Sequence, residues 1–596
     1  MSITPKGQSI QECYRLFRDG KIIVNRKYQR KLVWSNEQKE RLIDSIMAGY
    51  PIPLILLAER ADKYGSGVYE ILDGVQRLTA IFDFIENRVS WGNKYFNINE
   101  HIKAKNSLNE GCYTITDIPN KQYITSDECA DFLDYQLAVT IYPAMAETDM
   151  IEVFGRINSQ GKQLSNQERR QAGVVNKFSD LVRKIAFELR GDVSKDILKL
   201  YEMPAISFDD NRNDMSYGLK ADNIFWCKQG ILWKNELKSG EDEEMIADIL
   251  ASIILDTPFP RSREAFDSLY DENSPIYNEI NTAMLRTDVV ELYENVIGVF
   301  STIKDIIESC SDETNYFRDL VSNQKRNPAK TVYYTFFMAM YDLMVKKKMS
   351  PVSPNKIMKS IEKLQSKLAT ASHFVKEEDR VQNINLTIGL IQNCFVKQDP
   401  PLLGHGGSLI VDFENSVRRS KAETSRYEFK QGIYSVEQRP KLNEELIDKI
   451  LHTIVAIANS TFNSADGFLY IGVADSKEDA EQINNIYSSG YIKLEDKYVV
   501  GIDREIDANN MTIDQYISIL LDKIKHAKIS EPLKTQVLTN IDVISYKKYS
   551  VIRIRIPKQN TISLFDEKVY VRTGSSTKLV DTTSEILAIQ ELFTKA

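Results

Sequence analysis

The chain has 596 residues and a formal net charge of −8, and 42% of its residues are hydrophobic. A chain of this length is too long for one hydrophobic core and predicts three or four folded units, because a domain commonly has about 100–200 residues. The negative charge excludes a protein that coats nucleic acid with its whole surface, but a local basic site is compatible with it.

The N-terminal segment, the cysteines and the histidines indicate a cytoplasmic protein without zinc chemistry. Residues 1–17 lack an apolar signal-peptide core, and the longest apolar stretch, 52–58, is far shorter than the roughly 18 residues that a membrane span needs. The six cysteines include no C-x-x-C pair, which is typical of reduced thiols. The five histidines show no i, i+3 or i+4 spacing, which disfavours a zinc site. We expect no contact with a membrane.

The predicted elements begin with an α/β region of about 170 residues and continue with helices. Ser35 or Asn36 can cap a helix that runs through Met47, and residues 54–57 and 68–72 predict buried strands. A helix is expected over residues 78–85, and the short acidic run at 241–244 fits a helix start or a loop. Residues 178–396 show mainly helical periodicity.

Two prolines and three glycines in residues 397–408 predict a linker, after which the α/β pattern returns. The expected elements are a helix at 446–458, strands at 468–473, 551–556 and 569–572, and a turn at 574–576. The predicted organisation is a first domain at 1–175, a helical domain at 176–396, a linker at 397–412 and a last domain at 413–596.

Three polar clusters stand out in the first domain. They are Tyr28-Gln29-Arg30 with Trp34, Asp73-Gly74-Val75-Gln76-Arg77, and Phe154-Gly155-Arg156-Ile157-Asn158. A glycine between a strand and a helix lets backbone N–H groups approach a phosphate, and a helix N-terminus favours an anion. Arg77 would add a bidentate contact to that anion. Taken alone, the second cluster also fits an ordinary structural turn.

In this order the clusters resemble the N-terminal domain of GmrSD-type restriction enzymes, within the ParB/sulfiredoxin-like superfamily. The resemblance covers residues 10–175 and is strongest in YQRKLVW and YEILDGVQRLTAIFDFI. It implies a ParB-like α+β domain that binds or hydrolyses a nucleoside triphosphate (NTP), often coupled to sensing modified or foreign DNA. The implied phosphate site comprises Asp73, Gly74, Gln76 and Arg77, closed by Tyr28, Gln29, Arg30, Arg156 and Asn158.

Val75 departs from this family, which usually carries Gln at that position, whereas sulfiredoxins carry their reactive Cys there. Because Val75 has no thiol, reductase chemistry is excluded at this position. Because it also lacks the amide, the sequence favours nucleotide binding over nucleotide hydrolysis.

The last domain carries a second constellation, in which Glu428 and Lys430 lie two residues apart. If residues 427–430 form a strand, both side chains project to the same face. Together with Glu423 and Asp475, Glu428 would supply hard oxygen ligands for Mg²⁺ or Mn²⁺, and such ions activate water in phosphodiester cleavage. The alternative is a surface ion pair between Glu428 and Lys430 that contributes little.

The segments EFK, VAIANS, GFLYIGVAD, VVGID and VYVRTGSST resemble, in this order, a Schlafen AlbA-type α/β domain over residues 415–590. The resemblance implies a nuclease site in which Glu423, Glu428 and Asp475 bind the metal, with Lys430 beside them. This family often has two acids after I-G-V, whereas the first is replaced by Ala474 here. Arg572, Gly574 and Lys578 at the glycine turn are expected to bind nucleic acid or a nucleotide phosphate.

The sequence thus predicts a multidomain α/β protein that acts as a prokaryotic defence or restriction-like effector. An NTP-binding sensor domain would control a metal-dependent endonuclease acting on RNA or DNA, and the helical middle would transmit the change or form an oligomer. The alternative is a non-catalytic regulator that binds nucleic acid and nucleotide. A third hypothesis is a simple NTPase with a protein-binding tail.

Overall fold

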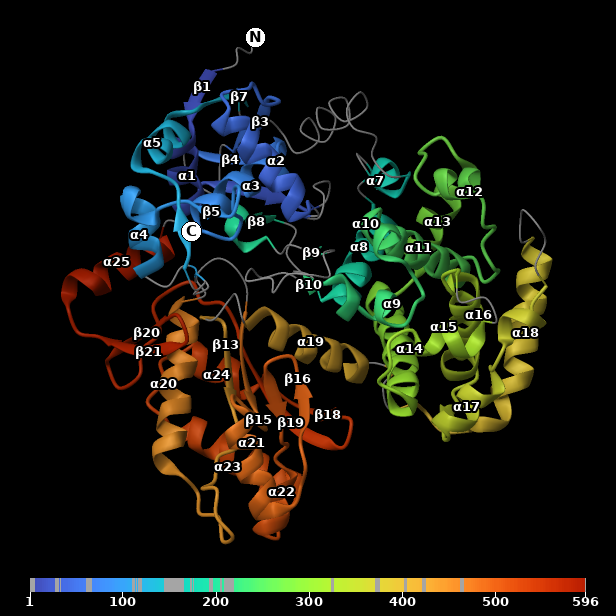
Figure 1. The fold of residues 1–596 in the computed structure, drawn as a ribbon. Coiled ribbons are helices and arrows are strands. Elements are labelled where there is room, and N and C mark those ends of the chain that lie inside the picture. Colours follow the sequence, from blue (N-terminus) through green and yellow to red (C-terminus); the bar gives the residue numbers. More distant parts are fainter. Residues whose placement is uncertain are drawn as a thin grey trace. The chain divides into compact units, whose positions relative to one another are not determined.

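The computed structural model forms two compact units, one within residues 1–411 and one within residues 412–596 (Figure 1). It describes residues 6–594 except 27–31, 33, 61–66, 110–112, 114, 116–119, 144–165, 172–173, 175, 192–196, 204–205, 208–218, 323–325, 370–375, 401–402, 404, 421–424 and 461–465. Among the helices in these described ranges, none combines the length and the apolarity needed to cross a bilayer.

The first unit begins with a six-stranded mixed sheet in the order β1-β7-β3-β4-β2-β8. Its strands are β1 (Lys6–Ser9), β2 (Ile22–Asn25), β3 (Ile55–Arg60), β4 (Val68–Asp73), β7 (Gln136–Tyr142) and β8 (Ile197–Lys199). The helices of this region are α1 (Ile10–Arg18), α2 (Asn36–Met47), α3 (Val75–Ile85), α4 (Ile102–Asn109) and α5 (Ser126–Asp134), with a short parallel pair of β5 (Lys94–Tyr95) and β6 (Gln122–Tyr123). The predicted strands at 54–57 and 68–72 and the helix through Met47 are confirmed.

Local sequence explains where α2 and α3 begin. Ser35 caps α2 through a capping box with Gln38, in which each side chain accepts from the other residue's backbone N–H. Helix α3 starts three residues earlier than predicted, at Val75, because Gly74 adopts a φ of 105° that ends β4 abruptly. The Val75 side chain is buried in the core of the sheet domain, so this position faces inward.

Strand β8 completes the first sheet although it follows the predicted domain boundary at residue 175. It pairs antiparallel with β2, with Val24 opposite Leu198. Leu198, Leu200 and Met203 belong to the same core as the N-terminal helices. The chain therefore passes through α8 (Lys177–Arg190) of the helical region and then returns to the sheet.

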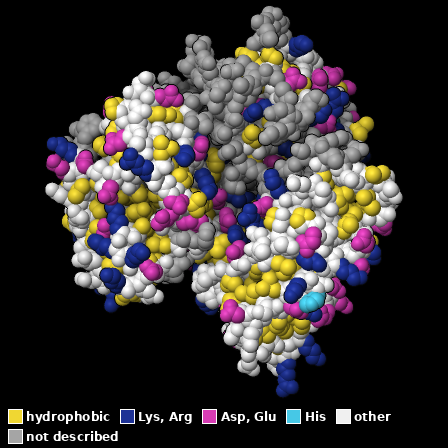
Figure 2. Space-filling view, turned by 180° about the vertical axis from the view of Figure 1, so that it is seen from behind, with side chains coloured by type: hydrophobic (Ala, Val, Ile, Leu, Met, Phe, Trp, Pro, Cys, Tyr) yellow, Lys and Arg dark blue, Asp and Glu magenta, His cyan; other side chains and the backbone are white. Residues whose placement is uncertain are grey.

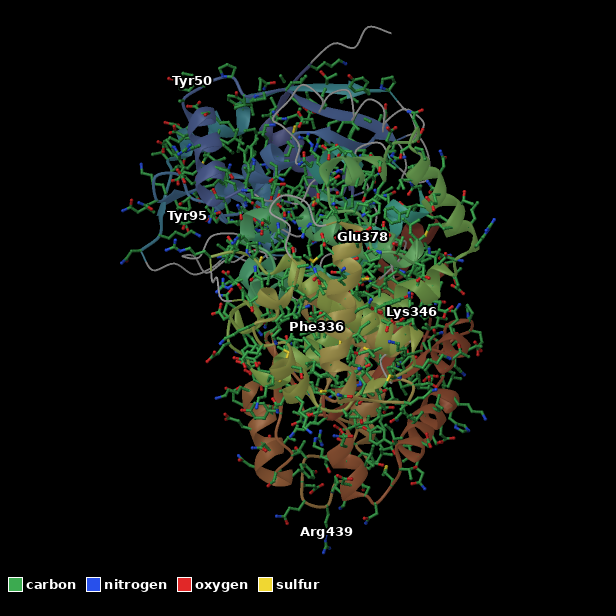
Figure 3. All side chains as sticks on the ribbon, turned by 90° about the vertical axis from the view of Figure 1, so that its right-hand side faces the viewer. Tyr50, Tyr95, Phe336, Lys346, Glu378 and Arg439 are labelled. Carbon is green, nitrogen blue, oxygen red and sulfur yellow. The ribbon has the colours of Figure 1, made fainter. Side chains whose placement is uncertain are left out.

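The helical region has its own core, in which the fully buried Trp226 packs against Phe300 and Tyr333. Besides α8, its helices are α7 (Asn166–Gln171), α9 (Phe225–Lys228), α10 (Lys234–Lys238), α11 (Glu241–Ile254), α12 (Arg263–Ser268), α13 (Pro275–Arg286), α14 (Val289–Cys310), α15 (Tyr316–Val321), α16 (Lys330–Tyr341), α17 (Pro354–Ser360) and α18 (Glu377–Ile391). Short pairs join β9 (Ile206–Ser207) to β10 (Leu219–Lys220) and β11 (Ser350–Pro351) to β12 (Phe395–Val396). Figure 3 shows the buried Phe336 of α16 and, at the surface, Lys346 and Glu378. The acidic run starts α11, as predicted.

Helix α19 (His405–Ser420) begins inside the segment predicted to be a linker. Its apolar residues recur at helical spacing, and Ile410, Val411, Phe413 and Val417 are all buried. Because of this periodicity, the helix begins before residue 412, where the predicted linker ends. The division between the two compact units falls within α19.

The second unit is an α/β domain with a four-stranded sheet in the order β13-β14-β19-β18. Its strands are β13 (Tyr427–Lys430), β14 (Gly467–Ile471), β19 (Tyr549–Ile556) and β18 (Ile541–Tyr546); a smaller sheet joins β15 (Val473–Ala474), β17 (Lys497–Val499) and β16 (Ile492–Leu494), and β20 (Val569–Thr573) forms a hairpin with β21 (Ser576–Val580). The helices are α20 (Glu444–Ser460), α21 (Lys477–Tyr487), α22 (Asp503–Ala508), α23 (Ile513–His526), α24 (Leu533–Leu538) and α25 (Thr583–Thr594). Helix α20 packs on the sheet face that carries Leu469 and Ile471, and α19 contributes Phe413 to the opposite face.

Candidate functional site

The predicted nucleotide site lies where two parallel strands of the first sheet end. Strands β2 and β4 pair in parallel, with Ile22 opposite Tyr69 and Ile23 opposite Glu70. Their carboxyl ends therefore meet at one sheet edge, from which β4 continues into Asp73 and Gly74. Tyr28, Gln29 and Arg30 come shortly after β2 in the sequence, but these three residues lie outside the described ranges.

The turn at Gly74 presents the N-terminus of α3 at this edge. Gly74 occupies the N-cap position, and no side chain caps the first turn of the helix. The first-turn N–H groups and the helix dipole together favour an anion at this position. Arg77 donates to Asp73 across the turn at 2.7 Å, and the side chain of Asp73 is 42% exposed. Gln76 accepts from the backbone N–H of Trp34 at 3.3 Å, so the structure brings the end of the first cluster to the second.

Strand β7, which precedes the third cluster in the chain, ends at a different edge of the sheet. Strand β7 is parallel to β3, and β3 is antiparallel to β4, so β7 ends at the edge where β4 begins. Arg156 and Asn158 belong to the residues 144–165, which are outside the described ranges. Their place in the nucleotide site stays a prediction. The described part of the site thus consists of Asp73, Gly74, Gln76 and Arg77.

The second candidate site lies on β13, the edge strand of the C-terminal sheet. Residues 427–430 form the predicted strand, and the Lys430 ammonium contacts the Glu428 carboxylate on the same face. The Arg572 guanidinium contacts the other oxygen of Glu428 at 2.8 Å. The side chain of Glu428 is 14% exposed and that of Arg572 only 2% exposed. This is a half-buried cluster of one acid and two bases, unlike the exposed pair that was the alternative.

Arg572 reaches Glu428 because the hairpin β20–β21 packs beside α20. The Arg572 backbone N–H donates to Ser460 Oγ at 2.7 Å, and Thr453 and Thr577 pair through their hydroxyls at 3.1 Å. The guanidinium also donates to the Tyr427 carbonyl at 3.4 Å. Arg572 was predicted to bind nucleic acid, but its buried guanidinium is positioned to hold Glu428 instead. Sequence could not indicate this contact, because the two residues lie far apart in the chain.

Asp475 follows a sharp turn of the chain at Gly472 and pairs with a different residue from Glu428. Gly472, with a φ of 110°, separates β14 from β15 of the smaller sheet, and Asp475 follows β15. The Asp475 carboxylate pairs with Lys497 at 2.8 Å and is 58% exposed. Glu423 lies outside the described ranges. Within those ranges no three His, Cys, Asp or Glu side chains are grouped to hold a metal ion, so the described residues alone do not fit the expected Mg²⁺ or Mn²⁺ site.

The glycine turn of the hairpin is formed as expected. Gly574 has a φ of 59° between β20 and β21, and Lys578 of β21 contacts Glu585 at 3.3 Å with most of its side chain exposed. Lys578 is therefore accessible to a phosphate, whereas Arg572 in the same hairpin is not.

A buried acid that the sequence did not single out fixes the chain just after Lys430. The Glu505 carboxylate accepts from the backbone N–H groups of Ile433 at 3.1 Å and Tyr434 at 3.4 Å, and from the Tyr516 hydroxyl at 2.6 Å. A side chain at Gly432 would collide with Glu505, since an added Cβ would lie 1.7 Å from its oxygen. Burial raises the pKa of Glu505 above its ordinary value. The only sequence signal was that Glu505 follows the VVGID segment.

Two family models match the chain. A model described as the GmrSD restriction endonuclease N-terminal domain matches residues 13–175, and a model described as Schlafen, AlbA_2 matches residues 423–581. The chain therefore contains a GmrSD-type N-terminal domain and a Schlafen AlbA_2 domain, and both resemblances are confirmed. No curated protein and no solved structure matches the chain.

Proposed function

We propose that this protein is a restriction-related effector that acts on nucleic acid. In this proposal the GmrSD-type domain binds an NTP and reports a trigger, and the Schlafen AlbA_2 domain cleaves RNA or DNA at Glu428. The pairing of these two matched domains in one chain supports the restriction-related role. Such pairing is physically reasonable because a nuclease must be held inactive until its trigger is present.

The observation that carries the nuclease proposal is the Glu428–Lys430–Arg572 cluster. The cluster of one acid and two bases has a formal charge of +1. Lys430, whose side chain is 23% exposed, would contact the oxygens of a bound phosphodiester and stabilise the negative charge that develops in the transition state. The buried Arg572 would stay paired with Glu428 and hold it in place. Once Lys430 contacts the phosphate, the Glu428 carboxylate would accept a proton from the attacking hydroxyl or water.

Metal dependence is a separate part of the proposal. Mg²⁺ or Mn²⁺ would supply an activated water and charge neutralisation, with Glu423, Glu428 and Asp475 as the expected ligands. Because the described residues do not assemble these three acids, we assign no step to the ion. Cleavage assays with and without Mn²⁺ decide whether it is needed.

The nucleotide site rests on the turn at Gly74. Asp73, Gly74, Gln76 and Arg77 would hold the phosphates, through the first-turn N–H groups of α3 and the Arg77 guanidinium. The absence of a side-chain cap on α3 supports this role, since a bound phosphate would satisfy these donors.

The test is to incubate the full-length chain with tRNA, single-stranded DNA and double-stranded DNA, each with and without Mn²⁺ and NTP. Glu428→Gln removes the charge and keeps the shape, so cleavage should fall by about 100-fold or more while binding is retained. Glu445→Gln, an exposed acid on α20, is the matched control and should cleave at the normal rate. Equal cleavage by wild type and Glu428→Gln would exclude the proposed site.

A non-catalytic regulator that binds nucleic acid and nucleotide is the second candidate. Ala474 in place of an acid, and the engagement of both Glu428 oxygens by cations, favour it. It predicts that wild type binds nucleic acid but cleaves none of the substrates under any of these conditions.

A further inference from the structure

The sheet face opposite Glu428 combines aromatic and basic side chains. Side chains alternate along β13, so Tyr427 projects away from the Glu428 cluster. The strand register places Tyr427, Phe468 and Arg555 side by side across three strands. On the face of the molecule in Figure 2, basic and acidic side chains are interspersed, so a basic site must be sought in local groupings of this kind.

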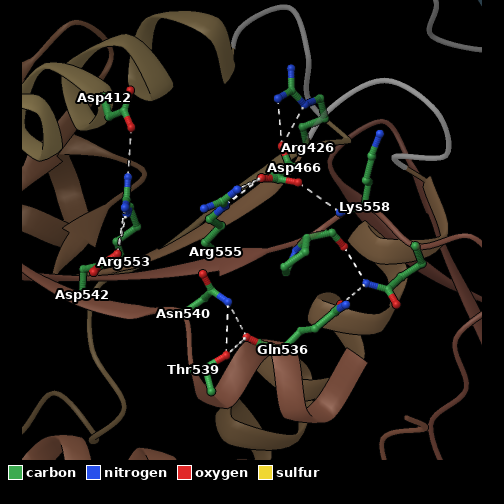
Figure 4. A network of polar contacts seen from close by, with 12 residues as sticks. Asp412, Arg426, Asp466, Gln536, Thr539, Asn540, Asp542, Arg553, Arg555 and Lys558 are labelled. Atoms are coloured by element: carbon green, nitrogen blue, oxygen red, sulfur yellow. Dashed lines mark hydrogen bonds and ion pairs between the residues drawn. The ribbon is translucent and has the colours of Figure 1, made fainter. Parts of the chain in front are cut away.

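Helix α19 covers only part of this face. Phe413 packs on Tyr470 with ring centroids 5.1 Å apart, and the Tyr470 hydroxyl donates to Ser416 at 2.8 Å. The neighbouring Arg553 is occupied, because it pairs with Asp412 of α19 at 3.0 Å and with Asp542 of β18 at 2.8 Å (Figure 4). This half of the face is therefore closed by structural contacts.

The other half carries two arginines and a lysine close to one acid, Asp466. Arg555 pairs with Asp466 at 2.6 Å, Arg426 donates to the Asp466 carbonyl at 2.8 Å, and the Lys558 backbone N–H donates to the Asp466 carboxylate at 3.1 Å (Figure 4). The four side chains have a formal charge of +2. Arg555 is 47% exposed, and Lys558 is also exposed. Asp466 thus fixes the positions of two guanidinium groups at an accessible edge of the sheet.

Phe468 lies beside these cations in a row of aromatic rings. Its ring stacks on Tyr427 at 6.0 Å with an interplanar angle of 11°, and the guanidinium carbon of Arg553 lies over the ring, 5.7 Å from its centroid. Phe468 is half-buried, whereas Tyr427 and Tyr470 are buried. An aromatic ring flanked by arginines is the arrangement with which proteins stack an unpaired base and hold its phosphates. A base pair in a duplex offers no free face to such a ring.

We propose that Arg426, Phe468, Arg555 and Lys558 form a second contact for single-stranded nucleic acid. A base would stack on Phe468, and the adjoining phosphates would contact the three cations. This inference rests on the proposed function and sharpens its substrate class to single strands. Because β13 is the edge strand of the described four-stranded sheet, Phe468 and Glu428 lie on opposite faces at the same edge of that sheet.

The test measures binding of a fluorescent single-stranded oligonucleotide by anisotropy, with full-length protein carrying Glu428→Gln to prevent cleavage. Arg555→Glu with Lys558→Glu should weaken binding about tenfold or more and reduce its dependence on salt. Lys525→Glu with Lys528→Glu makes the same charge change on exposed residues in and just after α23, and should have little effect.

Phe468→Leu should weaken single-strand binding about tenfold and leave duplex binding unchanged. Thermal melting confirms that each variant is folded.

The outcomes separate this inference from the proposed function. If wild type binds no nucleic acid, the proposed function fails and this inference fails with it. If wild type binds but the Arg555/Lys558 variant matches the Lys525/Lys528 control, only the second contact is excluded. If Phe468→Leu weakens duplex and single-strand binding equally, the stacking role is excluded.

Discussion

The two candidate sites hold their charged side chains in opposite ways. At the first, Arg77 in the first turn of α3 pairs with Asp73, the last residue of β4, and the exposed fractions of the two side chains are 12% and 42%. At the second, Glu428 meets Arg572, which comes from a hairpin 144 residues later in the chain, and both side chains are mostly buried. The first site depends on local geometry, and the second depends on the completed fold.

This difference has energetic consequences. Of the Arg77–Asp73 pair only Asp73 is exposed, so Asp73 would not be left as a buried unpaired charge if Arg77 exchanged it for a phosphate, and the exchange is expected to cost little. A buried pair costs desolvation on both sides and is maintained only with good geometry and further hydrogen bonds. Arg572 meets this condition through its contacts with Tyr427 and Thr577. The first site is therefore expected to be adaptable and the second rigid.

The strongest test of this contrast compares the stability effects of the two arginines. Arg572→Met should lower the free energy of unfolding of the C-terminal unit by about 3–5 kcal/mol, because it leaves the Glu428 carboxylate without its buried partner. Arg77→Met should lower stability by about 1 kcal/mol or less. Urea denaturation followed by circular dichroism measures both changes, and tryptophan fluorescence follows only the unit that contains Arg77, because all four tryptophans lie within residues 34–233. Similar losses in the two variants would show that the contrast in burial has no energetic consequence.

Arg77, whose replacement is expected to have the smaller effect on stability, is expected to have the larger effect on nucleotide binding. Arg77→Met should weaken NTP binding by about 10- to 100-fold, because a charge-assisted hydrogen bond contributes about 1.5–3 kcal/mol. Isothermal titration calorimetry measures the affinity. Arg41→Met, which removes an exposed ion-paired arginine from α2, is the control and should bind as wild type does. An unchanged affinity in Arg77→Met would place the nucleotide elsewhere.

The smallest expected effect concerns Glu505, which holds the backbone just after Lys430 of the second site. Burial raises its pKa from the ordinary 4.5, so the folded state holds the proton more tightly than the unfolded state. Its contribution to stability is therefore complete below about pH 4.5 and declines as the pH rises through the folded-state pKa. Wild type should lose stability relative to Glu505→Gln as the pH is raised above 4.5 in urea titrations. A gain over this range would mean that the hydrogen bonds to the carboxylate outweigh its burial.

The parts of the molecule that follow from local sequence were predictable. The cap at Ser35, the glycine turn at Gly74 and the shared face of Glu428 and Lys430 each depend on neighbouring residues, and the structure contains all three. The resemblance of both terminal domains to known families is confirmed by the family matches.

The parts that depend on distant residues were not predictable. No spacing rule connects Glu428 to Arg572, and the acid at Glu505 is recognised only when the turn at Gly432 is seen to close on it. The turn at Gly472 separates β14 from β15, the strand of another sheet that precedes Asp475. The sequence did not predict this turn, because Gly472 lies within a continuous apolar segment. These positions are set by tertiary pairing, which the sequence of one segment does not encode.

The pairing of β8 with β2 bears on how this protein can be divided for experiments. A fragment ending at residue 175, where the family match ends, would lack β8 and leave β2 as an open edge with unsatisfied N–H and C=O groups. Such edges recruit strands from other molecules, so this fragment should aggregate on expression. A fragment cut within the helical region has the same defect unless it retains residues 197–203. We therefore expect the GmrSD-type sheet of this chain to be isolated in folded form together with residues 197–203, which lie beyond its family match.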